Sequence, residues 1–184
     1  MLELQNISKT FGEKTLFENL SAVFPTGIHA VTGPSGVGKT TLLRIIAGLE
    51  PYSGTVQGAG KVSYCFQEPR LLPWRTALQN VALVSDNDTA AEMLCALGLE
   101  RDLNAYPEAL SGGMQCRAAL ARALAAPYDT LLLDEPFSGL DADTARGALQ
   151  LIRTCAKGKT VLLVTHDDTL ADTLDSNFKI QNEL

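Results

Sequence analysis

The stretch Gly33-Pro34-Ser35-Gly36-Val37-Gly38-Lys39-Thr40 decides the fold class of this chain. It matches the pattern G-x-x-x-x-G-K-[ST] in full and follows an apolar run, Ile28–Thr32, that predicts a short buried strand. Thr41–Ala47 then has the bulk and spacing of a buried helix. Glycines let such a turn aim its backbone N–H groups at an anion, and the positive end of the helix adds to the attraction. The sequence therefore predicts a phosphate-binding loop between a strand and a helix.

Within this loop, side chains and backbone share the binding of a nucleoside triphosphate. Lys39 supplies a cation for the β- and γ-phosphates, and the Thr40 hydroxyl can bind Mg²⁺. The predicted nucleotide-binding residues of this segment are Gly33, Pro34, Ser35, Gly36, Val37, Gly38, Lys39, Thr40 and Thr41. The loop alone does not say what the energy is used for, because kinases, GTPases, transport motors and DNA-repair ATPases share it.

Two acidic residues follow a second apolar run. Leu131–Leu133 predicts a buried strand, and Asp134 and Glu135 come directly after it. In a parallel sheet ligands lie outside the carboxyl ends of the strands, which places this pair beside the phosphate loop. Asp134 is suited to hold Mg²⁺, and Glu135 to orient or deprotonate the attacking water. Adjacent strand residues point to opposite faces, so we expect the two acids to have different tasks.

The remaining segments alternate between strand and helix. An antiparallel β opening is indicated by the residues up to Phe24, and later strands and helices follow in turn. The fold class predicted is therefore α/β, with a mostly parallel sheet flanked by helices and an N-terminal antiparallel β part. The expected strands are 2–5, 15–24, 28–32, 61–66, 130–133 and 160–165, the helices 41–47, 78–110, 114–126 and 144–156, and a surface loop 85–89.

Composition limits the class of protein. With 184 residues the chain is long enough for one core of ordinary size, and its net charge of −6 gives no general attraction to nucleic acid. The four cysteines lie far apart and predict small core residues of a reducing compartment. No apolar run approaches the roughly 20 residues that span a bilayer, and the first residues lack the pattern of a signal peptide. We therefore expect a cytoplasmic protein.

A second anion-binding segment is Leu110-Ser111-Gly112-Gly113-Met114-Gln115, directly before an Ala-rich helix. Ser111 can cap that helix, and the two glycines leave the backbone N–H groups open to a phosphate. The simpler interpretation is an ordinary Ser-Gly-Gly helix start. A second phosphate-binding site in a chain with a single phosphate loop is unusual for a monomer.

Over essentially its whole length the sequence resembles the ATP-binding-cassette (ABC) ATPases. The segment LSGGMQ is similar to the family signature and differs from its commonest form at Met114. Gln67 matches the glutamine that senses the Mg²⁺ and the lytic water, and His166 matches the switch histidine near the γ-phosphate. Ser138-Gly139-Leu140-Asp141 matches the D-loop, and Phe11 lies where the family places an aromatic that stacks on adenine. A strand phenylalanine is otherwise more often a core residue.

This resemblance implies a P-loop NTPase that works as a head-to-tail dimer. ATP with Mg²⁺ would lie between the phosphate loop of one copy and the signature residues Ser111, Gly112 and Gly113 of the other. The expected catalytic residues are Glu135, His166, Gln67 and Lys39; the expected metal ligands are Thr40, Gln67 and Asp134; and Phe11 and Asp141 join the nucleotide-binding set. Residues 1–184 would form a single ABC ATPase domain, with a small helical subdomain at about 68–126 that is shorter than usual.

Phe66–Trp74 and Thr76–Leu83 are similar to the corresponding segment of nitrate/sulfonate/taurine importer cassettes. In such systems the segment faces a membrane permease, and an exposed set from Leu71 to Trp74 would make an apolar docking surface. The alternative is a loop folded onto its own core. The resemblance implies an ATPase subunit on the inner face of the membrane, with a permease and a solute-binding protein as partners. Two further classes stay open, a soluble cassette acting on nucleic acid or ribosomes and a P-loop kinase of small molecules.

Overall fold

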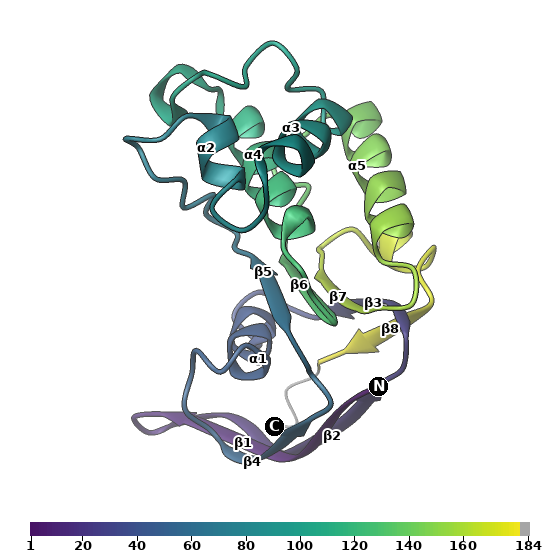
Figure 1. Ribbon diagram of the computed structural model, residues 1–184. Helices are drawn as coiled ribbons and strands as arrows, with labels where there is room; N and C mark the ends of the chain where they lie inside the picture. The colour runs from purple at the N-terminus through teal and green to yellow at the C-terminus, as the bar shows by residue number, and fades with distance from the viewer. Residues whose placement is uncertain (181–184) are drawn as a thin grey trace.

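The computed structural model describes residues 1–180, and its N-terminal part is an antiparallel sheet (Figure 1). Its strands are ordered β2-β1-β4, with bounds Leu2–Phe11 for β1, Lys14–Phe24 for β2 and Ser53–Gln57 for β4. Gly12 has a φ of 57°, a left-handed conformation that lets β1 and β2 join by a tight turn. The predicted antiparallel opening is confirmed, whereas β4 was not predicted.

The parallel sheet has the strand order β5-β6-β7-β3-β8. The bounds are Val62–Cys65 for β5, Thr130–Asp134 for β6, Thr160–Val164 for β7, Gly27–Thr32 for β3 and Ser176–Lys179 for β8. Every residue of β6 and β7 is buried, as expected for central strands covered on both faces. The parallel sheet is confirmed, and β8 is a strand that the sequence analysis missed.

Alternate residues of β6 face two different cores. Leu132 packs with residues of α1 (Lys39–Ile46) and of the antiparallel sheet, so α1 lies between the two sheets. Leu131 and Leu133 face the opposite side, where they meet α4 (Gly112–Ala125) and α5 (Ala142–Cys155). This period-2 division follows directly from strand geometry. Asp134, the residue after Leu133, lies at the carboxyl end of β6 beside the start of α1.

A group of helices lies beyond one end of the parallel sheet (Figure 1). It contains α2 (Ala77–Val81), α3 (Asn87–Ala96), a 3₁₀ turn at Pro107–Ala109 and α4. The helical prediction for residues 78–110 is correct only in part, because residues 82–86 and 97–106 form turns and irregular segments. The loop predicted at 85–89 is also wrong in part, because the Asp86 side chain accepts a hydrogen bond from Thr89 N (2.8 Å) and thereby starts α3 early.

Several smaller expectations are corrected or extended. Cys65 is a buried core residue as predicted, but Cys95 is exposed on α3, so the expectation of four core cysteines is wrong. His29 is buried in β3, and its ring nitrogens contact Ser176 Oγ and Pro25 O (both 2.8 Å), so its role is structural. A short helix, α6 (Asp168–Ala171), precedes β8. Within residues 1–180, no helix has both the length and the apolar character needed to cross a bilayer.

Candidate functional site

The phosphate loop connects β3 to α1 and depends on its glycines. Gly33 and Gly38 have φ values of 142° and 110°, which L side chains rarely adopt. A Cβ at Gly33 would lie 2.5 Å from the Ile180 carbonyl oxygen, and one at Gly38 would lie 2.6 Å from the Phe17 ring. These close approaches explain why the loop needs glycine at both positions. They hold its backbone tightly against the core below it.

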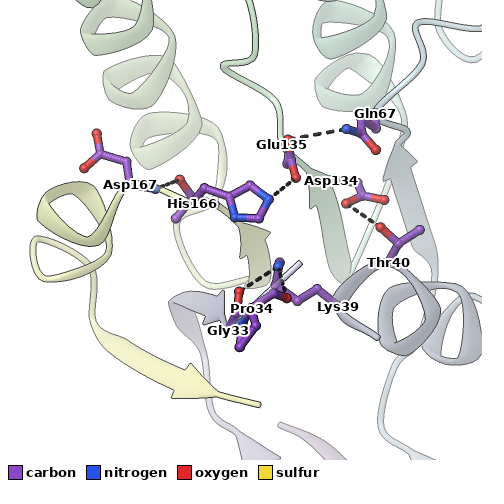
Figure 2. Close-up of polar contacts among 10 residues, drawn as sticks. Gly33, Pro34, Lys39, Thr40, Gln67, Asp134, Glu135, His166 and Asp167 are labelled. Atoms are coloured by element: carbon purple, nitrogen blue, oxygen red, sulfur yellow. Dashed lines mark hydrogen bonds and ion pairs between the residues drawn. The ribbon is translucent and has the colours of Figure 1, made fainter. Parts of the chain in front are cut away.

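Lys39 is the first residue of α1, and its side chain folds back over the loop (Figure 2). Its Nζ donates hydrogen bonds to the carbonyl oxygens of Gly33 (2.8 Å) and Pro34 (3.0 Å), and the residue is buried. Carbonyl partners satisfy a buried ammonium without neutralising its charge. The Lys39 side chain is therefore held in a fixed position over the loop.

A cavity of about 490 Å³ lies over the loop. It brings together Phe11 from the end of β1, the loop, Gln67 after β5, Glu135 after β6 and His166 after β7. The lining residues are Phe11, Lys14, Leu16, Ser35, Gly36, Gly38, Lys39, Thr40, Thr41, Gln67, Glu135 and His166. Lys14 and Leu16 were not predicted, since nothing in the sequence of the hairpin distinguishes them. The predicted residues Gly33, Pro34 and Val37 do not line the cavity, and of these Val37 is buried whereas Pro34 is exposed.

Asp134 lies at the edge of this cavity, where its carboxylate is almost fully buried (2% exposed). Its Oδ1 accepts a hydrogen bond from Thr40 Oγ1 (3.1 Å), and its Oδ2 accepts one from the Tyr64 hydroxyl (3.2 Å). Burial raises the pKa of Asp134 above its ordinary value, the charge of Glu135 adds to this, and the two hydrogen bonds oppose it. Tyr64 was missed, because a tyrosine within a strand carries no sequence signal for a site.

Glu135 follows β6, and its carboxylate lies between His166 and Gln67 (Figure 2). Its φ of 51° is in the left-handed region, an uncommon and strained conformation for glutamate that is typical of functional sites. One carboxylate oxygen, Oε1, lies 2.7 Å from His166 Nε2, and the other, Oε2, accepts a 3.4 Å hydrogen bond from Gln67 Nε2. The two acids therefore have separate sets of partners, as their adjacent positions predicted.

The signature segment and the D-loop do not line this cavity. The Ser111 side chain caps α4 by accepting a hydrogen bond from Met114 N (3.3 Å), so the predicted cap is present. Asp141 caps α5 by accepting bonds from Thr144 N (3.0 Å) and Thr144 Oγ1 (2.7 Å), and these bonds lower the pKa of Asp141. A Cβ at Gly113 would lie 3.2 Å from the carbonyl oxygen of Gly139. The D-loop thus packs closely against the start of α4.

The fold and this site define an α/β nucleoside triphosphatase (NTPase) with a phosphate-binding loop. Comparison with known proteins narrows the class, because residues 17–138 match the family model described as ABC transporter. The chain is 44% identical to the aliphatic sulfonates import ATP-binding protein SsuB 2 of Pseudomonas syringae pv. tomato, over 86% of this chain and 72% of that protein. It is 45% identical to SsuB 1 of Rhodococcus jostii, over 90% of this chain and 73% of that protein.

A solved structure agrees with these relatives. The dimeric, post-hydrolysis ATP-binding cassette MJ0796 bound to ADP and Pi is 32% identical, with a TM-score of 0.91 over 98% of this chain and 94% of that one. The chain belongs to the ABC transporter family and is an ATP-binding, ATP-hydrolysing subunit of that family. The fold-class prediction is therefore confirmed. These relatives give no support to a soluble cassette that acts on nucleic acid or ribosomes.

Proposed function

We propose that this chain drives the import of an aliphatic sulfonate or a similar small oxyanion through a separate membrane permease. The observation that carries the proposal is the identity of 44–45% to sulfonate import ATP-binding proteins, together with the cavity that gathers the phosphate loop, Glu135 and His166. The chain would then lie on the inner face of the membrane. A solute-binding protein would deliver the cargo, and the selectivity for the solute would reside in that protein and the permease.

Each residue of the site has a proposed task in hydrolysis. Lys39 and the loop N–H groups bind the β- and γ-phosphates, since the ammonium and the helix start both favour anions. Glu135 orients the attacking water and accepts its proton, and His166 positions the Glu135 carboxylate from 2.7 Å. Gln67 approaches the same carboxylate from the opposite side, and Phe11 stacks on adenine at the mouth of the cavity.

Mg²⁺ fits the oxygen atoms gathered at the end of β6. The Thr40 hydroxyl and the Asp134 carboxylate lie 3.1 Å apart, and Mg²⁺ prefers hydroxyl and carboxylate oxygens. We propose Thr40, Asp134 and, from its place after β5, Gln67 as the residues that hold the ion. When bound, it would neutralise charge that develops on the phosphates.

We further propose that two copies pair head to tail. Ser111, Gly112 and Gly113 begin a 14-residue helix, α4, yet they do not line the cavity of their own chain. A second copy related by a two-fold axis would bring these residues to the phosphates from the opposite side. The similar cassette MJ0796 is described as dimeric in two solved structures. Residues 1–184 would form one domain, with 68–126 as its helical subdomain, although 181–184 lie outside the described residues.

Trp74 is the proposed centre of the permease contact. It is the single tryptophan of the chain, and 70% of it is exposed. Leu71, in contrast, packs partly against the helical core, so the docking surface is smaller than the Leu71–Trp74 set that the sequence predicted. An exposed tryptophan is the residue type most enriched at the centres of interfaces.

The test is capture of a permease by the affinity-tagged chain from detergent-solubilised membranes, with identification by mass spectrometry. The captured complex, reconstituted in vesicles, should hydrolyse ATP faster when sulfonate-loaded binding protein is added. Trp74→Ser should abolish capture, whereas Val23→Ser, a change at another exposed apolar residue on β2, should not. Capture of no polytopic membrane protein, or equal capture by Trp74→Ser, would contradict the proposed docking.

A further inference from the structure

We propose that Lys9 is a positioning residue for the nucleobase. It holds the ring of Phe11 in place and also contacts Glu50 and Pro51, which follow α1 in the chain. The inference rests on the proposed function, because it assumes that Phe11 stacks on adenine. Lys9 itself does not line the nucleotide cavity. Its effect would therefore pass through Phe11.

The Lys9 side chain is buried, with 8% exposed, and the bonds of its ammonium are well defined. Its Nζ lies 2.8 Å from Glu50 Oε1 and donates a 2.8 Å hydrogen bond to the Pro51 carbonyl oxygen. Lysine is rarely buried unless its charge is paired, and an ammonium between a carboxylate and a carbonyl is fixed in position. Lys9 is therefore a rigid element of this part of the molecule.

The same ammonium lies 4.4 Å from the centroid of the Phe11 ring. Phe11 is 49% exposed at the end of β1, so little core packing fixes its ring. A cation over one face of an aromatic ring is an attractive contact that also holds the ring orientation. The face of the ring away from the ammonium is then a flat platform for a base. Adenine stacking on this platform would gain from its being fixed beforehand.

The contacts of Lys9 with Glu50 and Pro51 connect the Phe11 region to α1. These two residues follow the end of α1, the helix that begins with Lys39 of the phosphate loop. Phe11 belongs to the antiparallel sheet, and α1 lies between that sheet and the parallel one. Lys9 thus joins the part that would hold the base to the helix that would hold the phosphates. A fixed separation between the two favours a complete nucleotide over a triphosphate without a base.

The experiment compares two probes, ATP and inorganic tripolyphosphate, each with Mg²⁺ and measured by isothermal titration calorimetry. Lys9→Met keeps the length of the side chain and removes its charge. We expect it to weaken ATP binding by about 3- to 10-fold, within the range of a cation–π contact, and to leave tripolyphosphate binding within about 2-fold. Phe11→Ala should likewise weaken ATP binding and leave tripolyphosphate binding within about 2-fold. Lys157→Met, at an exposed lysine away from this site, controls for the change in net charge.

A double-mutant cycle tests whether Lys9 acts through Phe11. Lys9→Met should add little to the loss of ATP affinity in a chain that already carries Phe11→Ala. Glu50→Gln, a milder change at the partner carboxylate, should shift ATP affinity in the same direction and guards against misfolding of Lys9→Met. Additive losses, an unaffected ATP affinity in Phe11→Ala, or parallel losses for both probes would overturn the inference. Tripolyphosphate has no base, so its binding to the unmodified chain tests the phosphate loop alone. If the unmodified chain did not bind tripolyphosphate, the proposed function would fail, and not only the role of Lys9.

Discussion

His166 Nε2 lies 2.7 Å from Glu135 Oε1, while Gln67 Nε2 reaches the other carboxylate oxygen of Glu135 at 3.4 Å. The imidazole thus makes the shorter contact and holds a carboxylate whose backbone is already fixed at a φ of 51°. Replacing Glu135 by Gln keeps this shape and removes the proton acceptor. We expect ATP binding to persist and the turnover rate to fall by roughly 10²- to 10⁴-fold.

The measurement is phosphate release at saturating MgATP, together with gel filtration in the presence of ATP. Glu135→Gln should run as a dimer with ATP and as a smaller species without it, because bound ATP would favour the closed pair. Glu92→Gln on the exposed face of α3 is the matched control and should behave like the unmodified chain. Turnover within 2-fold of that control would remove Glu135 from the role of base.

Tyr64→Phe tests whether the Tyr64 hydroxyl supports Asp134, the carboxylate proposed to bind Mg²⁺. The change removes the hydroxyl that donates to Asp134 Oδ2 and keeps the ring, which stacks on Phe66 with centroids 4.1 Å apart. Loss of a partner that orients a metal ligand typically weakens metal binding by 10- to 100-fold, so we expect the Mg²⁺ concentration for half-maximal activity to rise by about 10-fold. Binding of Mn²⁺, followed by electron paramagnetic resonance, provides a second readout. An unchanged metal requirement would show that Thr40 alone suffices to orient Asp134.

Mixed dimers test the head-to-tail pairing. Lys39→Ala disables the phosphate loop, while Ser111→Asp keeps the cap of α4 and places a negative charge where a phosphate would bind. Each variant alone should be nearly inactive. An equal mixture contains one intact composite site in each mixed dimer, so roughly a quarter of the normal ATPase rate should return if the two sites act independently. A mixture as inactive as its components would contradict the pairing.

Asp86 provides a prediction on stability against pH. The hydrogen bond from Thr89 N, followed by that from the Thr89 hydroxyl, lowers the pKa of Asp86 below its ordinary value of 3.8. A carboxylate with a lowered folded-state pKa stabilises the protein above the unfolded value, and this contribution is lost as the pH falls through the folded value. Asp86→Asn keeps a neutral cap. Its melting temperature should therefore fall less than that of the unmodified chain between about pH 5 and about pH 2.5.

Other acids with lowered pKa values, among them Asp129, Asp141 and Asp167, are present in both proteins and cancel in this comparison. Thermal unfolding followed by circular dichroism at several pH values is the measurement. Parallel curves for the two proteins would mean that Asp86 titrates alike when folded and unfolded.

Much of the fold was predictable because local patterns determine it. The strand before the phosphate loop, the buried run Leu131–Leu133 and the Ala-rich helix after Ser111 all lie where the sequence placed them. Strands β4 and β8 were missed because neither alternates clearly. SGTVQ is mostly exposed, and SNFK is a short edge strand held by its pairing with β3. Such strands exist through tertiary pairing, which local composition does not encode.

The site was predictable to a similar degree, and for a related reason. Residues at strand ends converge on one edge of a parallel sheet, which placed Glu135 beside the phosphate loop, whereas Gln67 and His166 were predicted from the family resemblance; all three line one cavity. Tyr64 and Lys9 could not be predicted, because each acts through one contact with a residue distant in the chain, Asp134 and Glu50 respectively. The left-handed backbone of Glu135 was equally hidden, since that conformation depends on the surrounding packing.

The contact between Gly113 and Gly139 links two segments with different proposed tasks. The D-loop is hydrogen-bonded to Glu135, the residue proposed to activate water, since Ser138 N donates to the Glu135 carbonyl oxygen (3.1 Å). Gly113 belongs to the segment that would meet the nucleotide of the twin chain, and only 3.2 Å separates its Cβ position from Gly139 O. In a symmetric pair, each protomer would thus connect its own Glu135, through the D-loop and Gly113, to the nucleotide bound by its twin. Displacement of one triphosphate would then be felt at the second reaction centre through the direct contact of Gly113 with the D-loop residues Gly139 and Leu140.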